Sequence, residues 1–149
     1  MKKIGVVTEQ AGETRVAATP TTAKALIGLG YEVLIEAGSG TLSSFPDSAY
    51  QEAGCKVVSK EQAWAAEIIL KVNAPTPEEI TQLKDNATIV SLMSPALRPE
   101  LIESLATRGI TALALDAVPR ISRAQSMDVL SSMANIAGYR AVVEAAHEF

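Results

Sequence analysis

Residues 68–92, IILKVNAPTPEEITQLKDNATIVSL, show the pattern from which the fold class of this chain follows. An apolar run at 68–72 precedes Thr76-Pro77, a pair typical of a helix start, and a second β-branched run follows at 88–92. In neither run do apolar and polar residues alternate, which indicates strands covered on both faces, as in a parallel sheet. The stretch therefore predicts a β-α-β unit with a crossover helix.

The same pattern extends along the rest of the chain. Further strands are predicted at 4–7, 32–36, 56–58 and 110–115. Helices are predicted to begin at Thr19-Pro20 and at Pro99, and to end at Gly30 and Gly109, because glycine readily adopts the left-handed conformation that closes a helix. The alternation predicts an α/β fold with a doubly wound, mostly parallel sheet of Rossmann-like or flavodoxin-like order.

Composition excludes several classes of protein. The chain has 149 residues, 48% hydrophobic and 20% charged, which is typical of one folded domain and excludes intrinsic disorder. A net charge of −4 without a basic cluster argues against a nucleic-acid partner. The single cysteine, Cys55, and the single histidine, His147, exclude an internal disulfide and a Cys/His metal site. Neither a signal peptide nor a transmembrane segment is expected, so a cytoplasmic location is predicted.

The C-terminal segment, from about 126 to 149, is predicted to form one long helix. Apolar and small side chains recur at helical spacing from Leu130 to Ala145, and neither glycine nor proline ends the pattern. We therefore expect a helix truncated at Phe149, in a domain that is incomplete relative to a longer subunit.

A possible phosphate-binding motif follows the second strand. Gly38-Ser39-Gly40 opens a dinucleotide fingerprint, but the third glycine would fall at Ser43, and the next residues do not begin a helix. The motif is therefore interpreted as a turn. Without a pyrophosphate site, the chain is expected to bind NADH weakly at most.

Two cations are candidates for an anion site. Arg15 follows the first strand, and Lys71 lies near the end of the strand at 68–72. Both could face one anion, because the carboxyl ends of parallel strands border the ligand crevice. Alternatively, Lys71 extends out of the sheet into solvent and Arg15 pairs with Glu9 or Glu13.

The densest polar cluster is PRISRAQSMD at 119–128, directly after the last predicted strand. Arg120, Gln125 and Asp128 offer a guanidinium, an amide and a carboxylate, which suit a flat polar ligand such as a carboxamide. Alternatively, Ser122 and Gln125 have the spacing of a capping box, and Asp128 suits the first turn of the final helix. The two interpretations do not exclude each other.

Three stretches resemble one protein family. ETRVAATP at 13–20 and IILKVNAP at 68–75 resemble the N-terminal region shared by alanine dehydrogenases and proton-translocating NAD(P) transhydrogenases. The stretch from Pro119 to Arg140 resembles more specifically the NAD(H)-binding α subunit of the transhydrogenases. The resemblance covers essentially all of residues 1–149, without the glycine-rich NAD-binding domain that follows in family members.

The resemblance implies a role in an enzyme complex. Hydride would pass between NAD(H) on this component and NADP(H) on a partner component, coupled to proton translocation through a membrane component. A homodimer, peripheral to the inner (cytoplasmic) membrane, is implied as well, and the fragment alone is expected to be inactive. Gln125 and Asp128 would be the catalytic residues that orient the nicotinamide ring. The implied cofactor contacts are Arg120, Ile121, Ser122, Gln125, Asp128 and Ser131.

One residue departs from the alanine dehydrogenase pattern. In those enzymes, residues corresponding to Arg15 and Lys71 hold the substrate carboxylate, and a histidine serves as acid and base. Ser94 stands where that histidine is expected, and a serine hydroxyl cannot accept a proton near neutral pH as imidazole does. An alanine dehydrogenase-like oxidoreductase is therefore the disfavoured alternative, beside a non-catalytic, truncated interaction domain.

Overall fold

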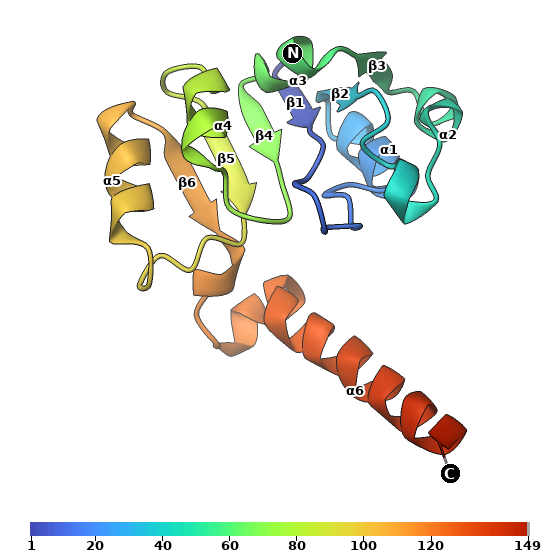
Figure 1. The fold of residues 1–149 in the computed structure, drawn as a ribbon. Helices are drawn as coiled ribbons and strands as arrows, with labels where there is room; N and C mark the ends of the chain where they lie inside the picture. The colour runs from blue at the N-terminus through green and yellow to red at the C-terminus, as the bar shows by residue number, and fades with distance from the viewer. Residues whose placement is uncertain (149) are drawn as a thin grey trace.

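One parallel sheet forms the centre of the molecule (Figure 1). The computed structural model describes residues 1–148, and within them the sheet has six strands in the order β3-β2-β1-β4-β5-β6, with every neighbouring pair parallel. The strands are β1 (Lys3–Val6), β2 (Glu32–Glu36), β3 (Lys56–Val58), β4 (Ile68–Leu70), β5 (Thr88–Ser91) and β6 (Thr111–Ala114). The predicted α/β class and doubly wound sheet are confirmed, and of the two expected strand orders the Rossmann order is found.

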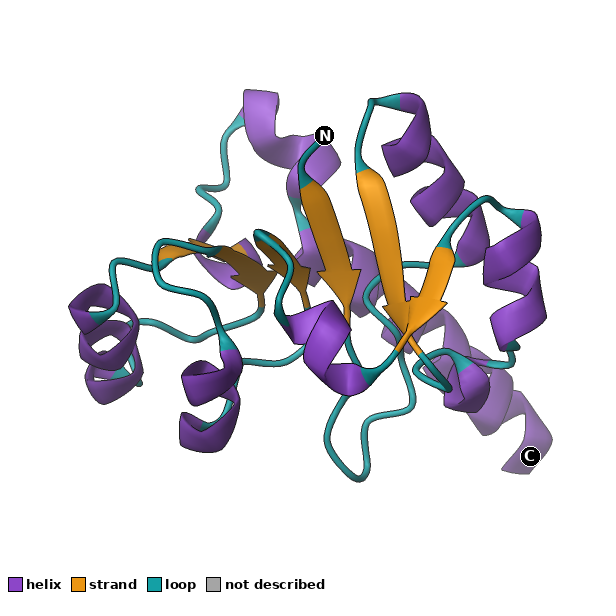
Figure 2. Cartoon of the chain, turned by 90° about the horizontal axis from the view of Figure 1, so that it is seen from above, coloured by secondary structure: helices purple, strands orange, loops and turns teal. Residues whose placement is uncertain are grey.

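Helices connect consecutive strands and cover both faces of the sheet (Figure 2). They are α1 (Pro20–Gly28), α2 (Asp47–Glu52), α3 (Lys60–Trp64), α4 (Pro77–Gln82) and α5 (Pro99–Thr107). The predicted cap at Thr76 is confirmed, since its hydroxyl accepts from the Glu79 N–H at 3.1 Å and the Glu79 carboxylate accepts from the Thr76 N–H at 2.9 Å. Gly30 and Gly109 follow their helices with φ of 93° and 65°, as the closing glycines were predicted to do.

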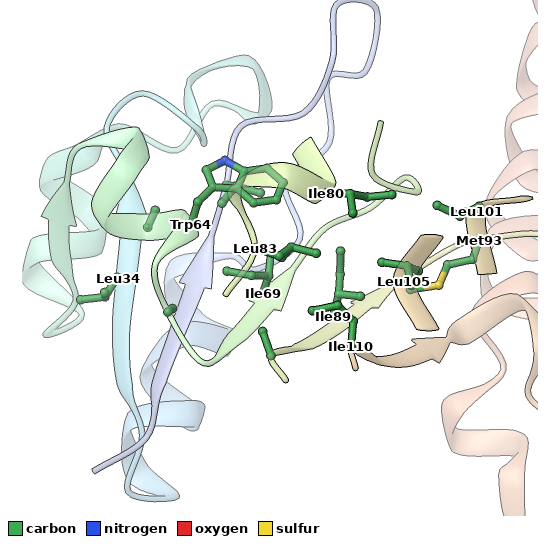
Figure 3. Close-up of a cluster of buried hydrophobic side chains, with 14 residues drawn as sticks. Leu34, Trp64, Ile69, Ile80, Leu83, Ile89, Met93, Leu101, Leu105 and Ile110 are labelled. Atoms are coloured by element: carbon green, nitrogen blue, oxygen red, sulfur yellow. The ribbon is translucent and has the colours of Figure 1, made fainter. Parts of the chain in front are cut away.

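Two apolar cores lie on opposite faces of the sheet. The larger core packs side chains of α3, α4 and α5 against β4 and β5, with Trp64 only 1% exposed (Figure 3). The smaller core packs α1 and α2 against β1 and β2 and includes the buried thiol of Cys55. The cores hold the sheet rigid, so the loops that leave its carboxyl edge start from fixed points.

The last helix, α6 (Val129–Glu148), extends away from the sheet (Figure 1). Its first part contacts the 3-10 turn Leu115–Ala117, and none of its described residues is buried. The predicted start near 126 is three residues too early, because Ser122–Met127 form a 3-10 helix instead. The prediction for Phe149 lies outside the described residues. Apolar side chains such as Ile136 and Val142 are 60% and 70% exposed, so α6 presents unburied apolar surface on this chain.

Candidate nicotinamide and anion sites

The loops that follow β1, β4, β5 and β6 leave the same edge of the sheet. The strand order reverses between β1 and β4, and open α/β sheets bind ligands at such a switch point, outside the carboxyl ends of the strands. Cavities of about 580, 450 and 450 Å³ are lined by residues of these loops. All of the site residues predicted from the sequence line one of the three.

The largest of these three cavities, about 580 Å³, lies at the loop after β6. The structure brings together here the whole set of implied cofactor contacts, which are Arg120, Ile121, Ser122, Gln125, Asp128 and Ser131. The side chains of Arg120, Ser122 and Gln125 are exposed and make no hydrogen bond to any residue from 1 to 148. Their polar groups are therefore free to bind a ligand.

Asp128 lines this cavity and caps α6. Its carboxylate accepts from the Ser131 N–H at 3.0 Å and from the Ser131 hydroxyl at 2.6 Å. The Ser131 hydroxyl and N–H lower the pKa of Asp128, so the carboxylate is charged at neutral pH. The predicted capping box between Ser122 and Gln125 is wrong, because Ser122 makes no capping hydrogen bond and Asp128 fills that role.

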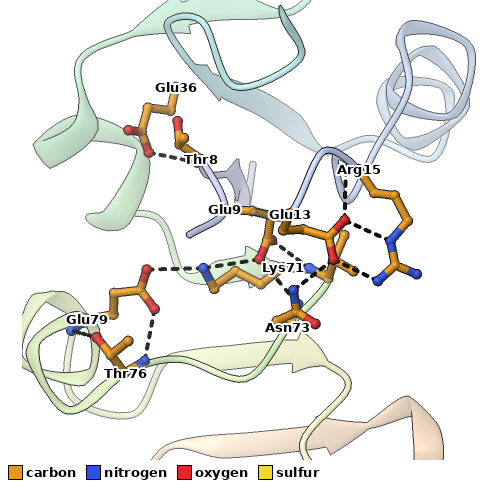
Figure 4. Close-up of polar contacts among 10 residues, drawn as sticks. Thr8, Glu9, Glu13, Arg15, Glu36, Lys71, Asn73, Thr76 and Glu79 are labelled. Atoms are coloured by element: carbon orange, nitrogen blue, oxygen red, sulfur yellow. Dashed lines mark hydrogen bonds and ion pairs between the residues drawn. The ribbon is translucent and has the colours of Figure 1, made fainter. Parts of the chain in front are cut away.

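A buried polar network surrounds Lys71 at the switch point (Figure 4). The Lys71 ammonium lies 3.1 Å from a Glu79 oxygen, 3.5 Å from a Glu9 oxygen and 5.7 Å from the centre of the Trp64 ring. The alternative in which Lys71 extends into solvent is therefore wrong, since its side chain is 0% exposed. The Glu9 carboxylate also accepts from the N–H of Val72 at 2.7 Å, which joins the loop after β1 to the loop after β4.

Arg15 pairs with Glu13, one of the two partners that the sequence suggested (Figure 4). Two guanidinium nitrogens donate to separate Glu13 oxygens at 2.9 and 2.7 Å, and the Asn73 amide donates at 2.9 Å. The Arg15 guanidinium, with the Asn73 amide, lowers the pKa of Glu13 to about 2. Arg15 and Lys71 do line one largely apolar cavity of about 450 Å³, but each cation already has carboxylate partners.

Ser94 and Asp116 meet in the remaining cavity. The Asp116 carboxylate accepts from the N–H of Met93 at 3.0 Å, the N–H of Ser94 at 2.6 Å and the Ser94 hydroxyl at 3.2 Å. Burial raises the pKa of Asp116, but these donors outweigh burial and lower it overall. Sequence reasoning did not identify Asp116 or the ion pairs of Lys71 with Glu9 and Glu79. It named Glu9 only as a possible partner of Arg15, and it expected Lys71 to face an anion or solvent.

The glycines after β2 have a packing role. Gly38 has φ of 80° in a turn, and a Cβ at Gly40 would lie 2.7 Å from the Tyr50 ring. No helix begins there, since a 3-10 turn follows and α2 starts at Asp47, so the prediction of a turn is confirmed. Among residues 1–148, we find no group of three or more side chains arranged to hold a metal ion, and no helix suited to crossing a membrane.

The strand order and the loop cavities at the carboxyl edge define a Rossmann-type domain of the nucleotide-binding class. The chain belongs to the family described as alanine dehydrogenase/PNT, N-terminal domain, which matches residues 5–137. It is 54% identical to the NAD(P) transhydrogenase subunit alpha of Haemophilus influenzae, over 92% of this chain and 27% of that protein. It is 36% identical to the alanine dehydrogenase of Bacillus subtilis, over 91% of this chain and 35% of that protein.

A solved structure shows the same relationship. The transhydrogenase from Sinorhizobium meliloti superposes with a TM-score of 0.93 at 42% identity, over 99% of this chain and 43% of that chain. An L-alanine dehydrogenase structure superposes with a TM-score of 0.74 at 34% identity, over 78% of this chain and 33% of that chain. The chain thus spans less than half the length of each of these relatives.

Proposed function

We propose that this chain forms part of the NAD(H)-binding component of a proton-translocating transhydrogenase, and that residues 119–131 cover the nicotinamide of NAD(H). One observation supports the proposal above all. Arg120, Ser122 and Gln125 line the same cavity of about 580 Å³, and their side chains make no hydrogen bond to any other residue among 1–148. Amide and guanidinium groups match the donors and acceptors of a carboxamide. Identity is also higher to the transhydrogenase subunit than to the alanine dehydrogenase, at 54% against 36%.

The residues of the cavity would orient the ring. When bound, NAD(H) supplies the hydride chemistry at its nicotinamide. The Gln125 amide would fix the rotation of the ring, and the Arg120 fork would hold more than one acceptor atom of the cofactor. The Asp128 carboxylate, held in place by Ser131, would help to orient the ring. Hydride would pass to NADP(H) on a partner component, and a membrane component would carry the protons.

Amino-acid oxidation is a weaker candidate, because the chain offers no proton acceptor at the relevant place. Ser94 cannot serve as a base near neutral pH. The neighbouring carboxylate, Asp116, is a poor base as well, since its N–H donors lower its pKa. We therefore expect no alanine-dependent reduction of NAD.

Single-turnover hydride transfer tests the proposal. The complete subunit that contains this segment would be assembled with its NADP(H)-binding component, and transfer between the two bound nucleotides would be timed. Gln125→Ala should slow transfer by about 100-fold, since misplacement of a reacting group by about 1 Å costs that much. Arg120→Ala should reduce both rate and NAD(H) affinity. Gln51→Ala, on the exposed face of α2, is the matched control and should behave as wild type.

Two outcomes would overturn the proposal. A wild-type rate of hydride transfer in both Gln125→Ala and Arg120→Ala would show that the loop 119–128 does not contact the cofactor. Alanine-dependent NAD reduction by the assembled wild-type protein would favour the amino-acid oxidoreductase instead.

A further inference from the structure

We infer that Asp116 is a positioning residue that holds the loop 119–128 and α6 in place relative to the sheet. The inference rests on the proposed function for its effect on hydride transfer, but its structural part stands on the contacts of Asp116 alone. Asp116 lies in the 3-10 turn Leu115–Ala117, between the end of β6 and the loop 119–128. No role for it follows from the sequence or from the proposed cofactor contacts.

Asp116 binds the neighbouring loop through both oxygens of its carboxylate. One oxygen accepts from the Met93 N–H at 3.0 Å, and the other accepts from the Ser94 N–H at 2.6 Å and the Ser94 hydroxyl at 3.2 Å. Ser94 has φ of 49°, a conformation that side-chain-bearing residues rarely adopt. With Ser94 in this conformation, two successive N–H groups point at one anion. The turn after β5 is therefore shaped to receive this carboxylate.

These bonds make up most of the side-chain hydrogen bonding between residues 115–148 and residues 1–114. Within residues 1–148, the side-chain hydrogen bonds that join these two segments are the three made by Asp116 and one 3.7 Å contact from Arg15 to the sulfur of Met133. Among the residues that the structure describes, β6 is an edge strand of the sheet, and it pairs with β5 alone. Within residues 1–148, no strand pairing supports the turn beyond the end of β6.

Asp116 lies close to the proposed cofactor site. The loop 119–128 begins three residues after Asp116, and the first part of α6 contacts the turn that carries Asp116. Charge-assisted hydrogen bonds are stronger than neutral ones and have defined directions, so the carboxylate fixes the turn in orientation as well as in place. Its lowered pKa keeps it charged at neutral pH, which preserves these bonds.

The structural part can be tested on this chain without any cofactor. Nitroxide labels would be attached through Glu103→Cys on α5 and Arg123→Cys on the loop, both exposed positions, and the distribution of distances between them measured. We expect a narrow distribution in the parent protein, broad in Asp116→Ala and intermediate in Asp116→Asn, which keeps one acceptor oxygen. Asp85→Ala, which removes a carboxylate that is 72% exposed, should leave the distribution unchanged.

Amide exchange adds a local readout. The Met93 and Ser94 amides should exchange about tenfold faster or more in Asp116→Ala, while the amides of β1 and β4 keep their protection. Ser94→Ala loses only the hydroxyl contact and should stay close to wild type. If Asp116→Ala does not fold, Asp116→Asn carries the test. An unchanged distance distribution, or unchanged exchange at both amides, in the folded Asp116 variants would overturn the inference.

The kinetic part separates this inference from the proposed function. In the assembled complex, Asp116→Ala should slow hydride transfer by about 10- to 100-fold, with a small change in NADP(H) affinity. Slow transfer in Gln125→Ala with wild-type transfer in Asp116→Ala would overturn the positioning role and keep the proposed function. Wild-type transfer in both Gln125→Ala and Arg120→Ala, with a broadened distance distribution in Asp116→Ala, would overturn the proposed function and keep the structural role of Asp116.

Discussion

Asp128 combines a helix cap with a proposed cofactor contact, and two substitutions separate these roles. Asp128→Ala should lower the free energy of unfolding, because the bonds to Ser131 are lost, and should also slow hydride transfer. Asp128→Ser keeps a capping hydroxyl, so stability should return while transfer stays slow. Denaturant unfolding together with single-turnover kinetics measures both. Restored transfer in the serine variant would show that Asp128 acts only as a cap.

The ion pair of Glu13 with Arg15 should make stability depend on pH in a defined range. The pKa of Glu13 is about 2 in the folded chain against an ordinary value of 4.5, so its contribution is present above pH 4.5 and lost as pH falls toward 2. Between these values, Glu13→Gln should flatten the slope of unfolding free energy against pH by up to about 1.4 kcal/mol per pH unit.

Acid unfolding followed by circular dichroism measures this slope. Glu103→Gln, on the exposed face of α5, controls for the removal of one carboxylate. An identical slope in Glu13→Gln and wild type would show that the ion pair does not contribute in solution.

For individual side chains, the sequence predicts contacts between residues that are close in the chain and misses contacts between residues that are distant in it. The residues of the 580 Å³ cavity all come from one continuous stretch, 119–131. The polar cluster at 119–128 was identified from the sequence itself, and Ser131 from the family resemblance. Glu13 was a suggested partner of Arg15 because the two residues are close in the chain. The partners of Lys71 lie in the loop after β1 and in α4, and Asp116 reaches the turn after β5. The pair of backbone N–H donors at Met93 and Ser94 has no side-chain pattern to mark it.

Among the elements, β1 and α3 approach each other closely at Gly5. A Cβ there would lie 2.2 Å from the Ala63 carbonyl oxygen, so Gly5→Ala should force the two elements apart and lower the free energy of unfolding by about 1–3 kcal/mol. Gly28→Ala, in α1, meets no atom within 4 Å and should instead raise stability by about 0.5–1 kcal/mol. Thermal unfolding of the Gly5→Ala and Gly28→Ala variants measures both effects. A neutral Gly5→Ala would mean that α3 does not pack this tightly on β1.

The helix α6 should behave differently from the rest of this chain. None of its described residues is buried, and helices draw most of their stability from packing. In the isolated chain, α6 should either exchange its amides far faster than the sheet or become protected as the chain dimerises at higher concentration. Hydrogen exchange with light scattering tests this. A monomer in which α6 is as protected as β1 would contradict it.

Element boundaries were predictable where a strong cap stands at the start. Thr19 and Thr76 cap α1 and α4, as the Thr-Pro pairs indicated. The start of α6 was placed too early because Asp128 was assigned to the first turn of the helix, whereas aspartate is among the strongest caps and its carboxylate reaches Ser131. The spacing of residues in the sequence did not favour Asp128 over Ser122 as the residue that caps the final helix.

For the whole molecule, the sequence predicted the class of fold and left the strand order open. Buried runs show that strands lie inside a parallel sheet, but which strands become neighbours depends on how the helices pack, and that is decided by contacts distant in sequence. At the switch point of the observed order, the loop after β1 carries Glu9 and Glu13 in place of a glycine-rich phosphate cradle. These carboxylates disfavour a pyrophosphate there, so affinity of this chain for NADH is expected to be weak.

The central claim is that the loop after β6 contacts the nicotinamide, and transferred nuclear Overhauser effects test it directly, since they suit weak binding. With the isoleucine methyl groups labelled, we expect cross-relaxation between Ile121 and the nicotinamide protons of NADH, and none between Ile121 and the adenine protons. Ile136, exposed on α6, is the matched control and should show no contact. Contacts from Ile121 to adenine, or equal contacts from Ile121 and Ile136, would contradict the assignment of this loop.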